Sequence, residues 1–287
     1  MSVKITDVRA VKGDSAFLID DGKTAVLYDS GFGFTGFKIA ENIKRELKDR
    51  ELDFIFLTHS HYDHALGSAY VKSVYKDAKV VAGEYAKKIF AKPSALALMR
   101  ELDAKFALKN GVESYEDLSS RLSVDIACKD GDKVCAGDMC FTALELFGHT
   151  RCSVGYYLED ESLLLSTESL GVYVGDSVVV PSYLVGYRMV LDSIRKVMSL
   201  KPEKILVPHF GVICGQEAEE YLKAALESAT ATAEEIAEII RSGGTKDDAV
   251  AHFVSKFYTD KVKEIYPYDA MMLNTSISVD LIIKELM

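Results

Sequence analysis

The chain has 287 residues, of which 27% are charged and 48% are apolar. These values are close to those of ordinary globular proteins, so a disordered or fibrous chain is excluded. The longest stretch without Asp, Glu, Lys or Arg is residues 205–216, far shorter than the roughly 20 apolar residues of a membrane-spanning helix. The formal net charge of −10 argues against a nucleic-acid partner, because phosphate binding needs clustered Lys and Arg.

The first 14 residues alternate charged with apolar residues and lack the apolar core of a signal peptide, so we expect a cytoplasmic protein. The five cysteines are odd in number, and no pair has C-x-x-C spacing. Free thiols are the expected state in a reducing compartment. Cys135 and Cys140 lie in a strand-like region, where we expect them to pack as small hydrophobic side chains.

The first half of the chain has the pattern of short strands followed by helices. Ile39, Ile43 and Leu47 recur every four residues, which predicts a helix with one apolar stripe. Residues 84–121 are expected to be mostly helical, with a break at Pro93 and a new helix start at Ser114. Apolar runs bounded by turn residues predict strands at residues 3–11, 16–19, 25–28, 54–58 and 79–82.

The pattern returns to strands over residues 124–165, followed by a helix at 184–200 and a strand at 205–207. Beyond Gly215 the sequence has the periodicity of helices only, and Thr245 with Asp248 three residues later predicts a helix start. We therefore divide the chain into a mixed α/β body, residues 1–215, and a helical C-terminal extension, residues 216–287, packed on it. A lid and a dimer surface remain alternatives for this extension, and a homodimer is the commonest state of soluble enzymes.

The segment His59-Ser60-His61-Tyr62-Asp63-His64 holds three of the six histidines of the chain and directly follows a predicted buried strand. Residues two apart in an extended segment point the same way, so His59 and His61 can face one point. Asp63 and His64 follow as the chain turns into a helix and face elsewhere. Imidazole nitrogen and carboxylate oxygen are the usual ligands of zinc and similar metals, so the pattern predicts two adjacent metal sites.

Two further histidines stand beside glycines at the ends of predicted strands. His149 lies in Gly148-His149-Thr150, and His209 lies in Pro208-His209-Phe210-Gly211. Loops at strand ends commonly carry functional residues, which favours a shared site. The sixth, His252, lies in the helical extension and is expected not to be a ligand.

The ordered set H-S-H-Y-D-H, G-H-T, an acidic residue and P-H-F-G resembles the metallo-β-lactamase superfamily over most of residues 1–215. The resemblance implies a four-layer αββα sandwich with a metal site at one edge of its two sheets. It also implies two divalent metal ions, most commonly zinc, with iron or manganese as alternatives. Metal one would be held by His59, His61 and His149, and metal two by Asp63, His64 and His209. Asp29 resembles the family's early Asp-x-Gly element, which orients a ligand loop.

One position departs from the family pattern. The family places an Asp, often within T-G-D or S-G-D, to bridge both metals, whereas this chain has Ser166-Thr167-Glu168. The side chain of Glu168 is one methylene longer, which can shift the metal spacing or restrict its binding mode. Asp176 is the nearby alternative.

The resemblance implies a metal-dependent hydrolase that activates a water molecule, with Asp63 both ligating and orienting that water. Small esters, thioesters or lactones are the expected substrates. The alternatives are a non-catalytic metal-binding or sensing protein of the same fold, which Glu168 keeps open, and an iron-dependent redox protein, which His61 disfavours. Cys152 can approach the site. Candidate pocket residues, each also consistent with packing, are Tyr173, Tyr183, Tyr187, Arg188, Tyr266 and Tyr268.

Overall fold

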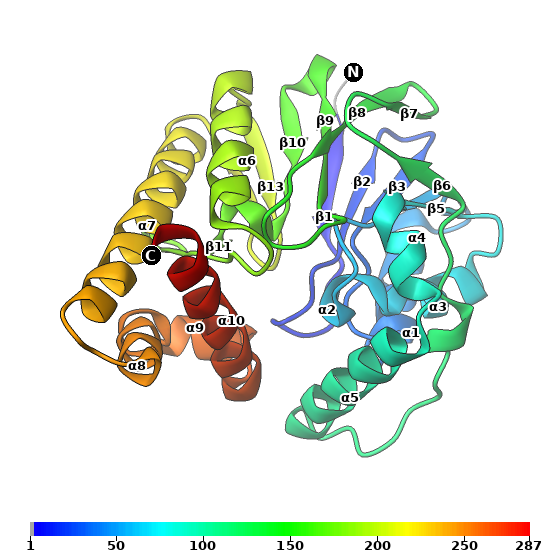
Figure 1. Ribbon diagram of the computed structural model, residues 1–287. Coiled ribbons are helices and arrows are strands. Elements are labelled where there is room, and N and C mark those ends of the chain that lie inside the picture. The colour runs from blue at the N-terminus through cyan, green and yellow to red at the C-terminus, as the bar shows by residue number, and fades with distance from the viewer. Residues whose placement is uncertain (1–2) are drawn as a thin grey trace. The chain divides into compact units, whose positions relative to one another are not determined.

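The computed structural model describes residues 3–287, and its ribbon is shown in Figure 1. The chain divides into two compact units. Unit 1 contains the residues up to Glu145 together with Val154–Leu165, and unit 2 contains Leu146–Ser153 and Ser166–Met287. The division at residue 215 that the sequence suggests stays a prediction.

Unit 1 begins with a six-stranded sheet whose strands follow one another in chain order. The first three strands pair antiparallel, and the next three add in parallel. The strands are β1 (Lys4–Asp7), β2 (Phe17–Asp20), β3 (Ala25–Tyr28), β4 (Phe54–Phe56), β5 (Lys79–Gly83) and β6 (Ile126–Cys128).

Parallel strands need crossover connections, and helices supply them here. Helix α1 buries Ile39, Ile43 and Leu47, as their spacing predicts. The helix start expected at Ser114 is wrong. Gly111 leaves the preceding helix with φ of 77°, and Asp117 accepts a hydrogen bond from the Ser119 amide, so this stretch forms only a 3₁₀ turn. The helices are α1 (Gly36–Leu47), α2 (Tyr62–Ala65), α3 (Gly67–Val74), α4 (Glu84–Phe90) and α5 (Pro93–Lys109).

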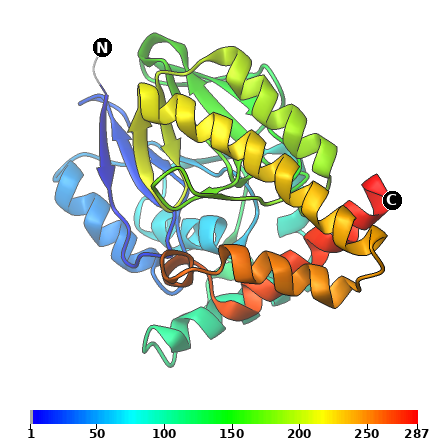
Figure 2. The ribbon, with the colours of Figure 1, turned by 90° about the vertical axis from the view of Figure 1, so that its left-hand side faces the viewer.

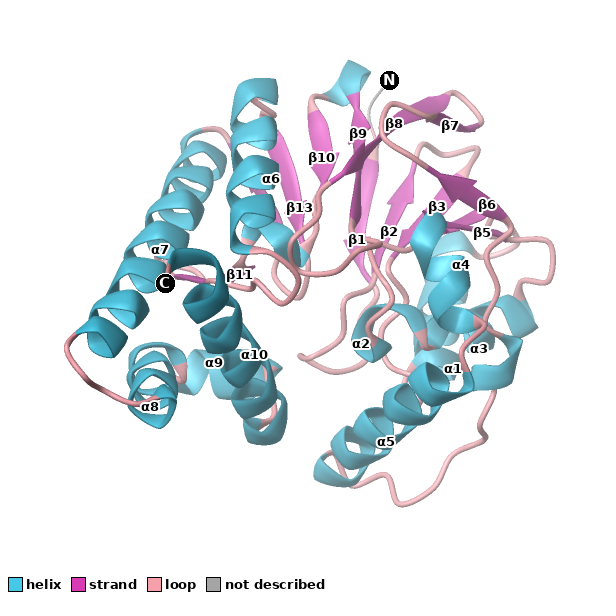
Figure 3. Ribbon diagram, in the orientation of Figure 1, coloured by secondary structure: helices cyan, strands magenta, loops and turns pink. Residues whose placement is uncertain are grey.

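The remaining strands of unit 1 are antiparallel neighbours in the order β10-β9-β8-β7 (Figure 3). They pack on the first sheet through aromatic rings: the ring centre of Phe56 lies 5.1 Å from that of Phe141 and 4.6 Å from that of Tyr156. The Tyr156 hydroxyl donates to the Leu57 carbonyl at 2.8 Å, so the buried phenol has a partner. These strands are β7 (Lys133–Ala136), β8 (Met139–Glu145), β9 (Val154–Leu158) and β10 (Leu163–Leu165).

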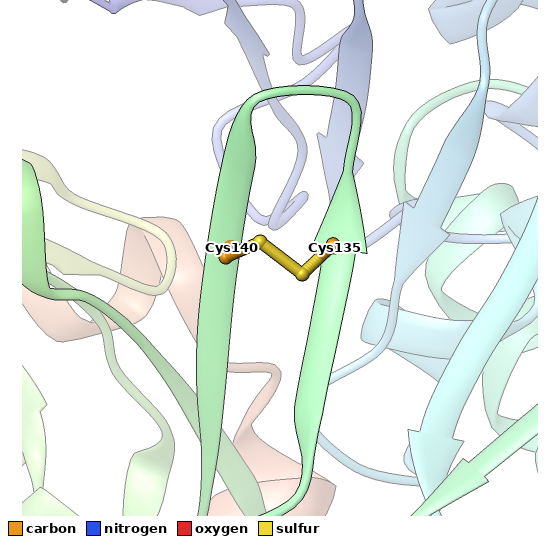
Figure 4. Close-up of a disulfide and its surroundings, with 2 residues drawn as sticks. All are labelled: Cys135 and Cys140. Carbon is orange, nitrogen blue, oxygen red and sulfur yellow. A yellow bond between two sulfur atoms is a disulfide. The ribbon is translucent and has the colours of Figure 1, made fainter.

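The expectation of free thiols at Cys135 and Cys140 is wrong, because the two form a disulfide (Figure 4). They are directly opposed in the register of strands β7 and β8, which brings their side chains to the same face. That face is exposed, whereas Val134 and Ala136 alternate with Cys135 and point inward. The two cysteines therefore do not serve as core side chains.

Unit 2 is mostly helical. Helix α6 begins at Tyr187, three residues later than predicted, because the amides of Leu184 and Val185 donate to the Gly148 carbonyl instead. Figure 2 shows the long helix α7 with α8 and α10, which contact one another. The elements are β11 (Val172–Tyr173), β12 (Val179–Val180), α6 (Tyr187–Leu200), β13 (Lys204–Val207), β14 (Gly211–Cys214), α7 (Gln216–Arg241), α8 (Lys246–Phe257), α9 (Asp260–Ile265) and α10 (Tyr268–Leu286).

The helix start expected at Thr245 is confirmed. The capping box at the start of α8 is present, since the Thr245 and Asp248 side chains each bond the other's amide. Over residues 3–287, no helix has the length and apolar character needed to cross a membrane.

Candidate metal centre

The histidine-rich segment of unit 1 lies where strand β4 ends and the chain enters helix α2. His61 precedes the first residue of α2, and its carbonyl accepts the amides of His64 and Ala65. This tight turn gathers the imidazole rings: the ring centre of His59 lies 4.6 Å from that of His61 and 4.1 Å from that of His64. The segment therefore brings its three histidines together, whereas the sequence pattern predicted that His64 would face away from His59 and His61.

Asp29 orients this cluster from the end of strand β3. Its carboxylate accepts the Thr58 amide at 2.8 Å and the Ser15 hydroxyl at 2.9 Å, and it lies 2.7 Å from Nδ1 of His64. Because a carboxylate accepts only, His64 must donate from Nδ1, and its Nε2 carries the lone pair that can bind a metal. Asp29 has φ of 51°, a left-handed conformation that Asp tolerates better than most residues.

Thr58 orients His59 in the same way. The Thr58 hydroxyl lies 3.0 Å from Nδ1 of His59 and donates to Asp29 at 3.0 Å. A hydroxyl has one proton, so Nδ1 of His59 is the donor to Thr58, and Nε2 is the atom suited to a metal. Thr58 has no motif that marks it, and sequence reasoning missed it.

The acidic member of the motif, Asp63, lies beside the same rings. Its Oδ2 atom lies 3.7 Å from Nε2 of His64, and ligand atoms of the two residues are within 4.8 Å of each other. Unlike the fully buried His59 and His64, Asp63 is only partly buried. A partly exposed carboxylate next to the metal-facing edge of an imidazole can both ligate and reach solvent.

Close backbone contacts hold the turn in place. The Ser30 amide and hydroxyl both donate to the His64 carbonyl, at 2.8 and 2.7 Å. A Cβ on Gly67 would meet the Ser30 carbonyl oxygen at 1.8 Å, so only glycine fits there.

The loop that follows Ser30 is held by Asp103, which is buried and accepts the amides of Gly33 and Phe34. Burial raises the pKa of Asp103 to about 6.

In unit 2, a second group of ligand-type side chains converges on Glu168, the first residue of a 3₁₀ turn after Thr167. Its Oε2 atom lies 2.9 Å from Nε2 of His149, and its Oε1 atom lies 3.5 Å from Nε2 of His209. All three side chains are nearly inaccessible to solvent. The carboxylate therefore turns one oxygen toward each histidine.

The two histidines of unit 2 are positioned by their surroundings. Nδ1 of His149 lies 2.7 Å from the Ser182 hydroxyl, and the His149 amide donates to the Ser169 hydroxyl at 3.2 Å. His209 has φ of 62°, a strained conformation of a kind often found at functional sites. Ser182 is a positioning residue that the sequence did not indicate, because it lies 33 residues from His149.

The Tyr266 hydroxyl donates to Oε1 of Glu168 at 2.9 Å. Tyr266 lies between helices α9 and α10, so the C-terminal helices reach a predicted metal ligand within unit 2. Tyr266 was one of several candidate pocket residues from the sequence, and its specific contact with Glu168 could not be read there.

The other candidates lie elsewhere in unit 2. Asp176, the alternative to Glu168, is exposed and pairs with Lys261 at 2.6 Å. Cys152 is buried, 3.3 Å from the Thr150 hydroxyl, and His252 lies 2.8 Å from Glu235. The remaining candidate aromatic residues are Tyr173, which donates to Glu217, the buried Tyr183 and Tyr187, and the exposed Tyr268.

The chemistry of these donors fits divalent metal ions. Unit 1 offers three imidazoles and one carboxylate, and unit 2 offers two imidazoles and one carboxylate. Within unit 1 the ligand atoms of His59 and His61 lie within 4.8 Å, as do those of His149 and Glu168 within unit 2. Mixed nitrogen and oxygen ligands without thiolate suit zinc, iron and manganese.

Two known proteins are similar in sequence to part of this chain. Metallo-beta-lactamase fold-containing protein ST1585 of Sulfurisphaera tokodaii is 28% identical over 177 residues, which cover 60% of this chain and 66% of that protein. Glyoxylase B2 of Dictyostelium discoideum is 26% identical over 156 residues, which cover 54% of this chain and 46% of that protein. The chain thus spans less than two thirds of the length of either relative.

Among solved structures, the metallo-beta-lactamase family protein TTHA1429 from Thermus thermophilus is similar with a TM-score of 0.63 and 18% identity. The match covers 93% of this chain and 87% of that one, and it shows the fold. The predicted αββα fold class is therefore confirmed. The family model of the metallo-beta-lactamase superfamily matches residues 11–209, a range that runs from before Asp29 to His209. The chain belongs to the metallo-β-lactamase superfamily.

Proposed function

We propose that the ligand residues predicted from the sequence hold two divalent metal ions and that the protein is a metal-dependent hydrolase. The observation that carries this proposal is the orientation of the buried imidazoles. His59, His64 and His149 each have Nδ1 at hydrogen-bond distance from a neighbouring oxygen, which directs Nε2 toward a metal. Purely structural histidines have no reason to share this arrangement across two separate loops.

Each residue has a distinct role in the proposed centre. His59, His61 and His149 would hold the first metal, and Asp63, His64 and His209 would hold the second. Glu168 would be a ligand to both, which its two differently directed oxygens support. We propose zinc as the metal, with iron or manganese as alternatives, because superfamily membership supports divalent metals in general and does not select one.

A dinuclear centre lowers the pKa of bound water and polarises the bond to be cleaved. The residues of the chain position the reactants. Asp63 is the proposed catalytic carboxylate, because a carboxylate has two oxygens and can orient the attacking water with one while ligating with the other. Asp29 and Thr58 hold His64 and His59 in the ligating tautomer throughout.

Small esters, thioesters or lactones are the proposed substrates. Similarity to a protein named Glyoxylase B2 supports a hydrolase of this kind. The net charge of −10 supports a small molecule over a nucleic acid.

Hydrolysis of an ester, thioester and lactone panel by the zinc-loaded full chain tests the proposal. We expect metal-dependent turnover of at least one class, its loss on chelation, and loss of at least one metal equivalent in His61→Ala. A His252→Ala variant is the matched control and should keep both metals and activity. Activity that survives chelation would contradict the proposal, and bound metal without turnover on the panel would favour a non-catalytic metal-binding protein.

A further inference from the structure

We propose that Tyr266 is a positioning residue that fixes the Glu168 carboxylate. The C-terminal helices of unit 2 thereby help to position the ligands of the proposed metal centre. The proposal rests on the proposed function, since it concerns the carboxylate assigned as the bridge. It gives these helices a role beyond packing.

Glu168 is restrained at both carboxylate oxygens. Oε1 accepts the Tyr266 hydroxyl at 2.9 Å and lies 3.5 Å from Nε2 of His209, while Oε2 lies 2.9 Å from Nε2 of His149. Glu has one more rotatable bond than the Asp that resembling proteins place here, so its carboxylate has more positions to occupy. The hydroxyl of Tyr266 selects among them the position that faces both histidines.

Tyr266 is itself held firmly. Its amide donates to the Val262 carbonyl at 2.8 Å, and its carbonyl accepts the Tyr258 hydroxyl at 3.3 Å. Pro267 follows with φ of −61° and leads into α10, which fixes the direction of the chain after Tyr266. A donor anchored on both sides can impose a geometry on the carboxylate that it contacts.

Helix α10 also supports a second proposed ligand of this unit, His149. Ser278 of α10 donates to the Tyr183 carbonyl at 3.0 Å, and the adjacent Ser182 lies 2.7 Å from Nδ1 of His149. Glu168 and His149 are therefore both supported from the C-terminal helices, one directly through Tyr266 and the other through the 182–183 segment.

Ser182 and Tyr266 also line a common cavity of about 20 Å³, together with residues of α8 and α10 such as Phe253 and Thr275. That volume suffices for a water molecule. It is far below the several hundred Å³ of a small-molecule site. This cavity is therefore too small to receive a substrate.

The test compares Tyr266→Phe with wild type, using zinc competition against a chromophoric chelator and the visible spectrum of the cobalt-loaded protein. We expect Tyr266→Phe to weaken the affinity for one metal equivalent by about 10- to 100-fold and to change the cobalt spectrum. The metal-free protein should stay folded, with a melting temperature only a few degrees lower, because one hydrogen bond to a buried carboxylate is lost. The control is Tyr268→Phe, which removes the hydroxyl of an exposed neighbour and should change neither readout.

Testing Tyr266→Phe in the Glu168→Asp variant distinguishes a loss of carboxylate positioning from a general structural defect. In Glu168→Asp the carboxylate is one methylene shorter and loses its contact with Tyr266, so adding Tyr266→Phe should change zinc affinity less than two-fold. An equal loss in both backgrounds would overturn the positioning role, as would wild-type affinity in Tyr266→Phe alone. If the wild-type chain binds no metal, the proposed function fails as well. If wild type binds two metals and Tyr266→Phe has the same zinc affinity, only this inference is overturned.

Discussion

The carboxylate of Asp29 lies 2.7 Å from Nδ1 of His64, although 35 residues separate the two in the chain. The same carboxylate binds the Thr58 amide and hydroxyl, and Thr58 in turn contacts Nδ1 of His59. One buried acid at the end of strand β3 thus sets the orientation of two imidazoles at the end of strand β4. Parallel pairing of these strands places their ends side by side.

Asp29→Asn should weaken metal binding. The Asn side chain has one oxygen and one NH₂ group, so it can no longer accept hydrogen bonds from both His64 and Thr58 as the carboxylate does. We expect zinc affinity to fall about 10- to 100-fold. Competition with a chromophoric chelator measures this. Asp176→Asn, the same change at an exposed ion pair, is the control and should leave the affinity unchanged. Wild-type affinity in Asp29→Asn would show that Asp29 does not tune the ligands.

Glu168→Asp should keep the bound metal and keep or raise hydrolysis, because Asp is the bridging residue that the superfamily commonly has at this position. Glu168→Ala removes both oxygens and should lose metal and at least about 100-fold in activity. Metal content and turnover of the two variants check this pair of expectations. Unchanged values in Glu168→Ala would rule out the bridging role.

Gly67→Ala should strongly destabilise unit 1. The added Cβ would lie 1.8 Å from the Ser30 carbonyl oxygen, so the Ser30–His64 contacts must shift, at a cost of about 3 kcal/mol or more in free energy of unfolding. Urea unfolding measures the change. Gly111→Ala is the control: its φ is +77°, but no atom lies within 4 Å of the added Cβ, so it should cost only about 1 kcal/mol. Equal effects of the two substitutions would contradict the steric account.

Asp103 should make stability depend on pH below neutrality. Burial raises its pKa from 3.8 to about 6, so between these values the folded protein binds more protons at this site than the unfolded chain. The free energy of unfolding therefore falls as pH rises through this window. Relative to Asp103→Asn, wild type should lose on the order of 2 kcal/mol between pH 4.5 and 7.5. A pH-independent difference between the two would contradict the assignment.

Local patterns predicted much of the fold. The four-residue spacing of Ile39, Ile43 and Leu47 gave a helix that buries those residues, and Thr245 with Asp248 marked a helix start that forms. The failures occurred where side chains override local preference. Asp117 binds the Ser119 amide instead of continuing a helix from Ser114, and the opposed register of Cys135 and Cys140 allows a disulfide that spacing alone did not suggest.

The ligand-type residues could be identified from the sequence because histidine is rare and its positions follow strands. Their positioning partners could not. Ser182 and His149 are 33 residues apart, and Tyr266 and Glu168 are 98 apart. Serine and tyrosine are common residues with many roles, and only the folded chain brings these particular hydroxyl groups to the ligands.

Elemental analysis of the untagged full chain, purified without chelator and without added metal, tests the central claim most directly. The proposed centre predicts about two equivalents of divalent metal per chain, with at least one lost in His61→Ala. No bound metal, or full retention in His61→Ala, would contradict the assignment of these residues as a dinuclear metal site.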